Sequence, residues 1–214
     1  MTNQRIVTYI MCIYGLCKNN LNTYSQLSWN VKAGMNLSKA TGWADISLKP
    51  GYQFGVGIEH YFNSHWGIQP LLMLVSKGYK AKGDYNYPLE WNAPAEKYDV
   101  TTNRVYLELP VMLAYKINLI DQINLVLNGG GYISYGIAGK YKNKITLEDD
   151  SKVTEKNDAF SSGTERFDTG LGAGVTFEFR NKYTIGLIGE WGLKSVIGDY
   201  SKNQTYGLNI GYKF

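Results

Sequence analysis

The sequence is poor in the residue types that most enzymes and metal proteins depend on. It contains only two histidines, His60 and His65, and only two cysteines, Cys12 and Cys17. Two histidines cannot form a three-histidine metal site, and the sequence has neither a P-loop nor a G-x-S-x-G motif. We therefore predict no catalytic residues, no metal site and no cofactor.

Long hydrophobic runs and dense positive charge are also missing. No stretch of 18 apolar residues occurs, which excludes a membrane-spanning helix. Spanning strands escape this test, because they need only about 9–11 residues and alternate apolar with polar side chains. The net charge of +4 is spread along the chain without a run of lysine or arginine, so we predict no nucleic-acid partner.

Proline is scarce, whereas glycine and tyrosine are abundant. The chain has 5 Pro against 24 Gly and 18 Tyr, and aromatic residues make up 14% of it. This aromatic content excludes a disordered chain. A helical bundle is disfavoured because glycine and tyrosine are poor to middling helix formers. The composition indicates a β-rich protein.

The N-terminal segment is typical of a secretory signal peptide. Arg5 precedes twelve mostly apolar, uncharged residues at 6–17, and a polar stretch follows. The small residues Thr23 and Ser25 suit a cleavage site before Gln26. We predict a signal peptide at 1–25 and one domain at 26–214, which would leave the mature chain without cysteine. The alternative interpretation of 6–17 is an ordinary apolar first strand.

Beyond the N-terminus, alternation of apolar and polar residues with a period of two recurs eight times, as in half-buried strands. The eight segments are 27–37, 51–62, 66–80, 105–117, 123–141, 167–179, 183–193 and 205–214. The third of them is apolar on both faces in its middle.

The connections between these segments alternate strictly in length. Short turns lie at 63–65, 118–122 and 180–182, and long polar loops at 38–50, 81–104, 142–166 and 194–204. An up-and-down meander through a bilayer has short periplasmic turns and long external loops. We expect 81–104 and 142–166 to be mobile external loops.

Two kinds of barrel fit eight such strands. A soluble lipocalin-like barrel lines a cavity with its apolar face, whereas a membrane barrel turns that face to lipid. Many strand glycines, among them Gly55, Gly172 and Gly207, fall on the polar face. They would weaken a solvated sheet, but they make room for long side chains inside a narrow lumen. This favours an all-β fold: an eight-stranded antiparallel up-and-down transmembrane β-barrel.

Aromatic residues near the strand ends support the same fold, because rings gather at the two membrane–water interfaces of such barrels. The predicted girdle residues are Trp29, Phe62, Trp66, Tyr115, Phe179, Tyr183, Trp191 and Tyr212.

Charged residues on the polar face should point into the lumen. Buried charges must pair, since an unpaired charge in a low-dielectric interior costs several kcal/mol. We predict a salt-bridge network that plugs the barrel, formed by Lys32, Glu59, Glu108, Lys116, Asp168, Glu178, Glu190 and Lys213.

The sequence resembles the porin-family or PorT-like outer-membrane β-barrels of Gram-negative bacteria. The resemblance covers nearly all of 31–214 and includes KPGYQFGVGIEHYF, VYLELPVMLAYKI, FDTGLGAGVTFEF and the terminal YGLNIGYKF. It implies an integral outer-membrane location, with membrane lipid and the assembly machinery as partners. The alternation that resembles an assembly signal comprises Tyr206, Leu208, Ile210, Tyr212 and Phe214.

Three functions fit this sequence. The first is a non-enzymatic barrel with a plugged, polar lumen whose long loops bind an extracellular ligand or partner protein. The second is a small porin-like transport or secretion-accessory barrel, since one branch of the resembling family is linked to protein secretion. The third is a soluble lipocalin-like carrier or an outer-membrane enzyme.

Overall fold

The chain folds into antiparallel strands alone in the part that our computed structural model describes: residues 26–41, 46–85, 96–146, 152–160, 164–196 and 201–214. The predicted signal peptide at 1–25 lies outside these residues. The strands are β1 (Gln26–Ala40), β2 (Ile46–Ser47), β3 (Lys49–Tyr61), β4 (Trp66–Tyr85), β5 (Glu96–Ile120), β6 (Ile123–Thr146), β7 (Lys152–Asp158), β8 (Phe167–Phe179), β9 (Tyr183–Gly192) and β10 (Asn203–Lys213).

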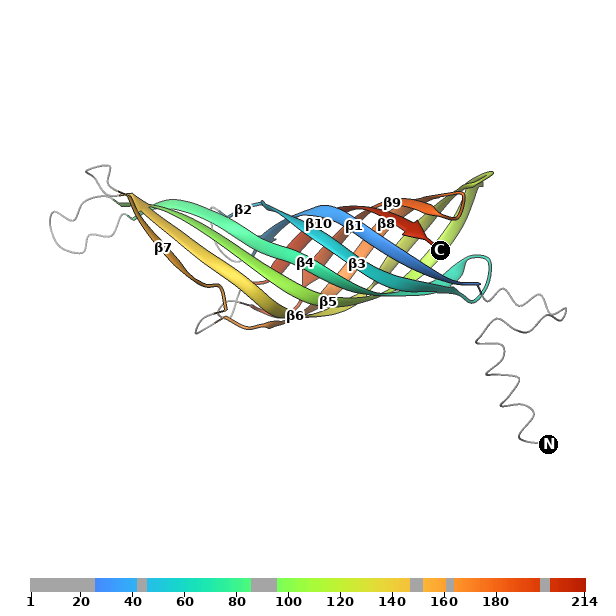
Figure 1. Ribbon diagram of the computed structural model, residues 1–214, viewed down its shortest axis with the longest axis horizontal. Coiled ribbons are helices and arrows are strands. Elements are labelled where there is room, and N and C mark those ends of the chain that lie inside the picture. Colours follow the sequence, from blue (N-terminus) through green and yellow to red (C-terminus); the bar gives the residue numbers. More distant parts are fainter. Residues whose placement is uncertain (1–25, 42–45, 86–95, 147–151, 161–163, 197–200) are drawn as a thin grey trace, which may run out of the picture.

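Eight of these described strands close into a barrel. Their order around the ring is β4, β3, β1, β10, β9, β8, β6 and β5, and pairing between β4 and β5 closes it. Figure 1 shows the strands running obliquely along the long axis of the molecule, with the C-terminus at the end of the short turns. The predicted eight-stranded antiparallel barrel is therefore confirmed.

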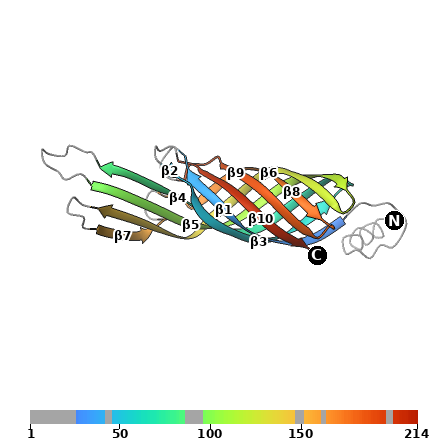
Figure 2. The same ribbon diagram turned by 90° about the horizontal axis from the view of Figure 1, so that it is seen from above.

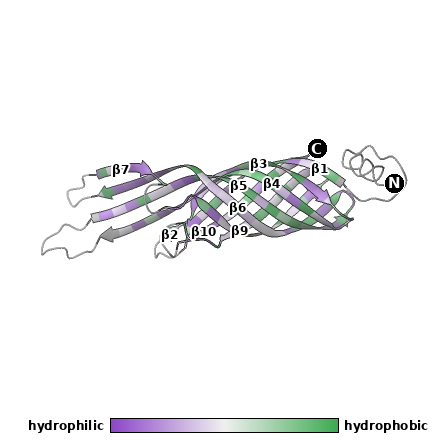
Figure 3. Cartoon of the chain, turned by 90° about the horizontal axis from the view of Figure 1, so that it is seen from below, coloured by the Kyte–Doolittle hydropathy of each residue, from purple (hydrophilic) through white to green (hydrophobic). Residues whose placement is uncertain are grey.

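The period-two pattern sorts the side chains between the two faces of the barrel wall. On β5, Leu107, Leu109 and Leu113 are exposed on the outside, while Glu108 and Met112 are buried inside. Figure 3 shows apolar residues recurring along the barrel strands. A soluble barrel would bury such a row of leucines, whereas a membrane barrel turns it to lipid.

The tight turns form at the residues that the sequence indicates. Asn63 accepts hydrogen bonds through Oδ1 from the backbone amides of His65 at 2.8 Å and Trp66 at 2.7 Å. Gln122 and Asn181 take positive φ angles of 68° and 55° in the other two short connections. These local contacts reverse the chain within a few residues and fix the register of each hairpin.

The structure corrects the expectation that 81–104 and 142–166 are loops. β4 continues to Tyr85, β5 begins at Glu96, and β6 continues to Thr146, where it pairs with the additional strand β7. Figure 2 shows β4, β5, β6 and β7 projecting together beyond the rest of the barrel. We call this part, which comprises residues 78–85, 96–103, 140–146 and 152–158, the projecting sheet. These segments resemble loops in sequence because neither of their faces is fully apolar.

No helix in the described part of the chain is long and apolar enough to cross a membrane.

Candidate functional site

The candidate functional site is the interior of the barrel, where most of the predicted lumen charges form two separate clusters. One cluster lies toward the short turns and the other toward the projecting sheet.

The cluster near the short turns joins strands from opposite parts of the sequence. Lys213 on β10 contacts Glu178 on β8, and its Nζ lies 2.6 Å from Glu59 Oε2 on β3. Lys116 on β5 places its Nζ 2.9 Å from Glu178 Oε1 and 4.3 Å from the centre of the Tyr61 ring. Two lysines thus bind two carboxylates across the lumen, so every charge in this cluster has a partner.

The cluster toward the projecting sheet is centred on Lys77 of β4. Its ammonium binds the carboxylate of Glu108 on β5, and its Nζ lies 3.3 Å from Glu190 Oε2 on β9. The Nζ also lies 4.3 Å from the centre of the Tyr132 ring, which supplies a favourable cation–π contact. One cation therefore ties three strands together inside the barrel.

Asp168 extends this second cluster through hydrogen bonds from two neutral side chains. Its Oδ2 accepts a hydrogen bond from Asn203 Nδ2 at 2.8 Å, and the Tyr132 hydroxyl donates to the same oxygen at 3.4 Å. Because Tyr132 also faces Lys77, the aspartate and the lysine cluster share one aromatic neighbour.

Phe160 covers the lumen beyond Lys77. It follows β7, is buried, and packs edge-on against Tyr106 with 5.8 Å between ring centres. Arg166 stacks on the Phe160 ring at 4.7 Å and donates from Nη1 to the carbonyl of Gly136 at 3.0 Å. A Cβ on Gly136 would collide with the Phe160 ring, so glycine at this position gives the ring its place.

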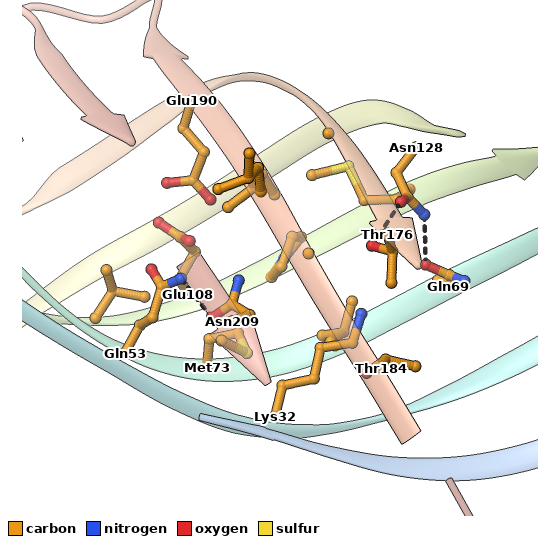
Figure 4. Close-up of a pocket in the computed structure, with 18 residues that line it drawn as sticks. Lys32, Gln53, Gln69, Met73, Glu108, Asn128, Thr176, Thr184, Glu190 and Asn209 are labelled. Atoms are coloured by element: carbon orange, nitrogen blue, oxygen red, sulfur yellow. Dashed lines mark hydrogen bonds between the residues drawn. The ribbon is translucent and has the colours of Figure 1, made fainter. Parts of the chain in front are cut away.

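A cavity separates the two clusters. Its wall combines apolar side chains such as Leu71 and Met112 with amides, including Gln69 and Asn128, which are joined by a 2.8 Å hydrogen bond. Figure 4 shows Lys32 entering this cavity from the side opposite Glu108 and Glu190. Among the described residues, Lys32 has no ion-pair partner within 4 Å.

The structure thus brings seven of the eight predicted lumen charges into contacts within the two clusters and leaves Lys32 outside them. It also adds two charges that the sequence analysis missed. Lys77 lies in the segment that is apolar on both faces, and Arg104 lies just before a predicted strand. Both could have been found from the sequence. Lys77 is an even number of residues from Gln69, and Arg104 an even number from Glu108, so each shares a face with a residue of the polar, lumen side.

The predicted girdle residues lie on the outer wall. Trp66 and Tyr115 pack together at 4.7 Å, and Tyr183 and Tyr212 at 5.4 Å, all near the short turns. Trp29, Phe62 and Phe179 are exposed at the same end, and Trp191 contacts Tyr206 at the opposite end.

The predicted assembly signal lies on the outer side of the last strand. Tyr206, Leu208 and Ile210 are exposed along β10, and Tyr212 and the exposed Phe214 complete the alternation at the C-terminus.

The described residues contain no group of three or more histidine, cysteine, aspartate or glutamate side chains that could hold a metal ion. The polar groups of the interior are instead paired charges and hydrogen-bonded amides. Such groups can lock neighbouring strands together and hold water or a small polar solute.

Several solved structures are similar to this chain at low sequence identity. The attachment invasion locus protein Ail of Yersinia pestis is 18% identical, with 87% of this chain and 98% of that chain covered and a TM-score of 0.40. OprG of Pseudomonas aeruginosa is 12% identical, with 91% and 99% covered and a TM-score of 0.43. Neisserial surface protein A is 11% identical, with 88% and 99% covered and a TM-score of 0.40.

No curated protein matches the sequence closely enough to count as a relative. The family described as outer membrane protein beta-barrel domain matches residues 18–198, which is most of the chain. The narrower resemblance to PorT-like barrels stays a prediction. The protein is an integral outer-membrane β-barrel and belongs to the outer membrane protein beta-barrel domain family.

Proposed function

We propose that this protein is a non-enzymatic barrel with a closed lumen, which presents its projecting sheet to ligands or partner proteins outside the cell. The closed lumen rests on one observation: an ion-pair cluster spans the interior toward each end of the barrel. A solute would have to displace both clusters, and breaking a buried ion pair costs about 3–5 kcal/mol.

Phe160 and the narrow lumen support the same proposal. Eight strands leave an interior just wide enough for side chains to fill, so a continuous aqueous pore exists only where the side chains leave room in the lumen. Beyond the Lys77 cluster, that room is taken by the buried rings of Phe160 and Tyr106.

Liposome swelling tests the closed lumen. Proteoliposomes that contain the folded full chain should take up a small sugar at the rate of protein-free liposomes, while a general porin in the same lipid gives rapid swelling. Swelling that rises with the amount of this protein would contradict the proposal and favour the small transport barrel.

Cysteine labelling tests which end faces outward, after Cys12 and Cys17 are replaced by serine. A Thr154→Cys variant on β7 should react with a membrane-impermeant maleimide in intact cells. The Asn181→Cys variant, in a short turn, should react only after the outer membrane is permeabilised. The reverse pattern would place the projecting sheet in the periplasm and overturn the proposed contact with external partners.

A further inference from the structure

The projecting sheet carries all of its lysines on one face. In antiparallel strands, residues directly opposite each other share a face. From the barrel outward, the rows on this face are Gly78, Asn103, Lys140 and Asp158; Lys80, Thr101, Lys142 and Lys156; Lys82, Asp99, Lys144 and Thr154; and Lys97, Thr146 and Lys152.

We define the lysine face by the eight lysines in these rows: Lys80, Lys82, Lys97, Lys140, Lys142, Lys144, Lys152 and Lys156. All eight are exposed or half-exposed. Within the projecting sheet, the opposite face of the described residues has no lysine; its rows contain Tyr79, Tyr98, Val100, Ile145 and Val153 among others. Such segregation gives one face a concentrated positive charge.

Acidic groups neutralise this face only in part. Asp99 Oδ2 lies 3.2 Å from Lys82 Nζ, and Asp158 Oδ1 accepts a hydrogen bond from the amide of Phe160. The row of Lys80, Thr101, Lys142 and Lys156 has no acidic residue at all. Within it Lys142 and Lys156 are directly opposite, an arrangement of like charges that destabilises a sheet by itself. A bound anion would remove this repulsion.

The lysine face continues the outer, lipid-facing wall of the barrel. On β5, Thr101 has the same parity as Val105 and the exposed Leu107. On β6, the register shifts by one residue at Ile137, so the exposed Lys140 beyond it lies on the same outer side as the exposed Ile137. The other face continues the lumen wall, since the centre of the Tyr79 ring lies 5.8 Å from Cζ of the buried Arg104. The lysines are thus on the side of the sheet that looks out over the membrane.

The height of the lysines suits the headgroup layer. Thr101 lies four residues beyond Val105, which corresponds to roughly 10 Å along the axis of a barrel with strands tilted about 40°. The polar headgroup zone of a bilayer begins at the edge of the apolar core and is several ångströms thick. A phosphate in that zone can reach the lysine row of Lys80, Lys142 and Lys156.

One residue of the first row, Asn103, is already in contact with the neighbouring strand β3. Lys49 of β3 places its Nζ 2.8 Å from Asn103 Oδ1, and the same oxygen accepts from Ser76 Oγ at 2.8 Å. Lys49 therefore adds a further cation beside the first row, and the exposed lysines of β6 and β7 stay open to the membrane side.

From these observations, we propose that the lysine face binds the phosphorylated glycolipid headgroups of the outer leaflet. The lysines would hold the phosphates of several neighbouring lipid molecules against the outer side of the projecting sheet. The inference rests on the proposed outward orientation of the projecting sheet, which the cysteine labelling tests separately, but it is independent of whether the lumen is closed.

The test titrates the detergent-solubilised, folded full chain with lipopolysaccharide and with the same lipid after its phosphates are removed. The native chain should bind the phosphorylated form at least tenfold more tightly, and added salt should weaken that binding because ions screen exposed charges. Equal affinity for both lipids would overturn the proposal, and this comparison needs no variant.

A charge-removal variant locates the contact. Each lysine near an anionic membrane surface adds to the attraction between protein and lipid. The K80Q/K140Q/K142Q/K156Q variant should therefore bind lipopolysaccharide about 100-fold more weakly than the native chain at low salt. The matched control R180Q/K182Q, at the short turns, should bind like the native chain, and so should the variant with four arginines in place of the same four lysines. Unchanged binding by the glutamine variant, with its fold verified by heat-modifiable electrophoretic migration, would show that the lysine face is not the site.

A soluble polyanion is the competing occupant. Inorganic polyphosphate, tested in the same assay, should compete only weakly with lipopolysaccharide. Tight binding of polyphosphate without binding of lipopolysaccharide would overturn the assignment to lipid.

Discussion

Lys77 on β4 and Glu108 on β5 form an ion pair inside the barrel, where each side chain is only 1% exposed. Glu190 approaches the same ammonium from β9 at 3.3 Å. One cation on β4 thus binds two carboxylates, one on β5 and one on β9. Removal of that cation leaves two buried negative charges side by side, which makes Lys77 the key residue of the cluster.

We predict that Lys77→Met lowers the free energy of unfolding by about 3–5 kcal/mol, because an uncompensated buried charge remains. Urea titration of the folded barrel in detergent measures this loss. Lys82→Met is the matched control, since the Lys82 side chain is 71% exposed and pairs with Asp99 at the surface. It should change stability by less than about 1 kcal/mol. Similar losses for both variants would contradict the ion-pair account.

Lys32 should behave differently from the paired lumen lysines. It has no ion-pair partner among the described residues, so Lys32→Met should leave the unfolding free energy unchanged or raise it. Lys116→Met removes a charged hydrogen bond to Glu178 and should cost roughly 1.5–3 kcal/mol in the same urea titration. A larger loss for Lys32→Met than for Lys116→Met would show that Lys32 has a stabilising partner.

The orientation of the wall predicts how an outward charge acts. Leu109→Arg should destabilise the barrel in lipid vesicles by about 2–4 kcal/mol, because Leu109 is exposed on the outer wall in the middle of its strand. Leu119→Arg, near a short turn, should cost about 1 kcal/mol or less. Unfolding in denaturant from vesicles measures both, and equal costs would argue against a lipid-facing wall at Leu109.

Phe160 should control access to the mouth of the lumen. In a chain with Cys12 and Cys17 changed to serine, Tyr106→Cys should react slowly with a soluble maleimide, because Tyr106 is fully buried beneath Phe160. Gly136→Leu displaces the Phe160 ring and should raise the labelling rate at least tenfold. Gly129→Leu is the control, since a Cβ there meets no other atom within 4 Å, and it should leave the rate unchanged. Equal rates for both backgrounds would mean that Phe160 does not cover the mouth.

The barrel itself could be predicted because lipid and a narrow lumen impose opposite chemistry on alternate residues. The segments 105–117 and 167–179 show this alternation clearly, with Thr169 as a polar exception on the outer face of the second, and both lie within strands of the ring. The pairing of the first strand, β1, with the last, β10, was implied by the even number of strands in an up-and-down meander, because an even number makes these two strands antiparallel.

The projecting sheet escaped prediction for a physical reason. In 140–146, lysines alternate with Tyr141, Asn143 and Ile145, so the pattern has a period of two but no fully apolar face. A half-buried strand is recognised by that apolar face. The lysines at 140, 142 and 144 nevertheless keep strict alternation, which is the signal that could have revealed the strand.

The interior contacts depended on tertiary arrangement. Parity placed Glu108 and Glu190 inside, but only the register of β4 brings Lys77 between them. The burial of Phe160 depends on the course of the chain after β7, and no local pattern in the sequence indicates it.

The most direct test of the closed lumen is a planar-bilayer recording of the purified, folded full chain. Because an ion-pair cluster spans the interior toward each end, we predict no stable conductance steps above those of the protein-free bilayer. Reproducible, long-lived open channels of large conductance would contradict the closed lumen and assign the protein to transport.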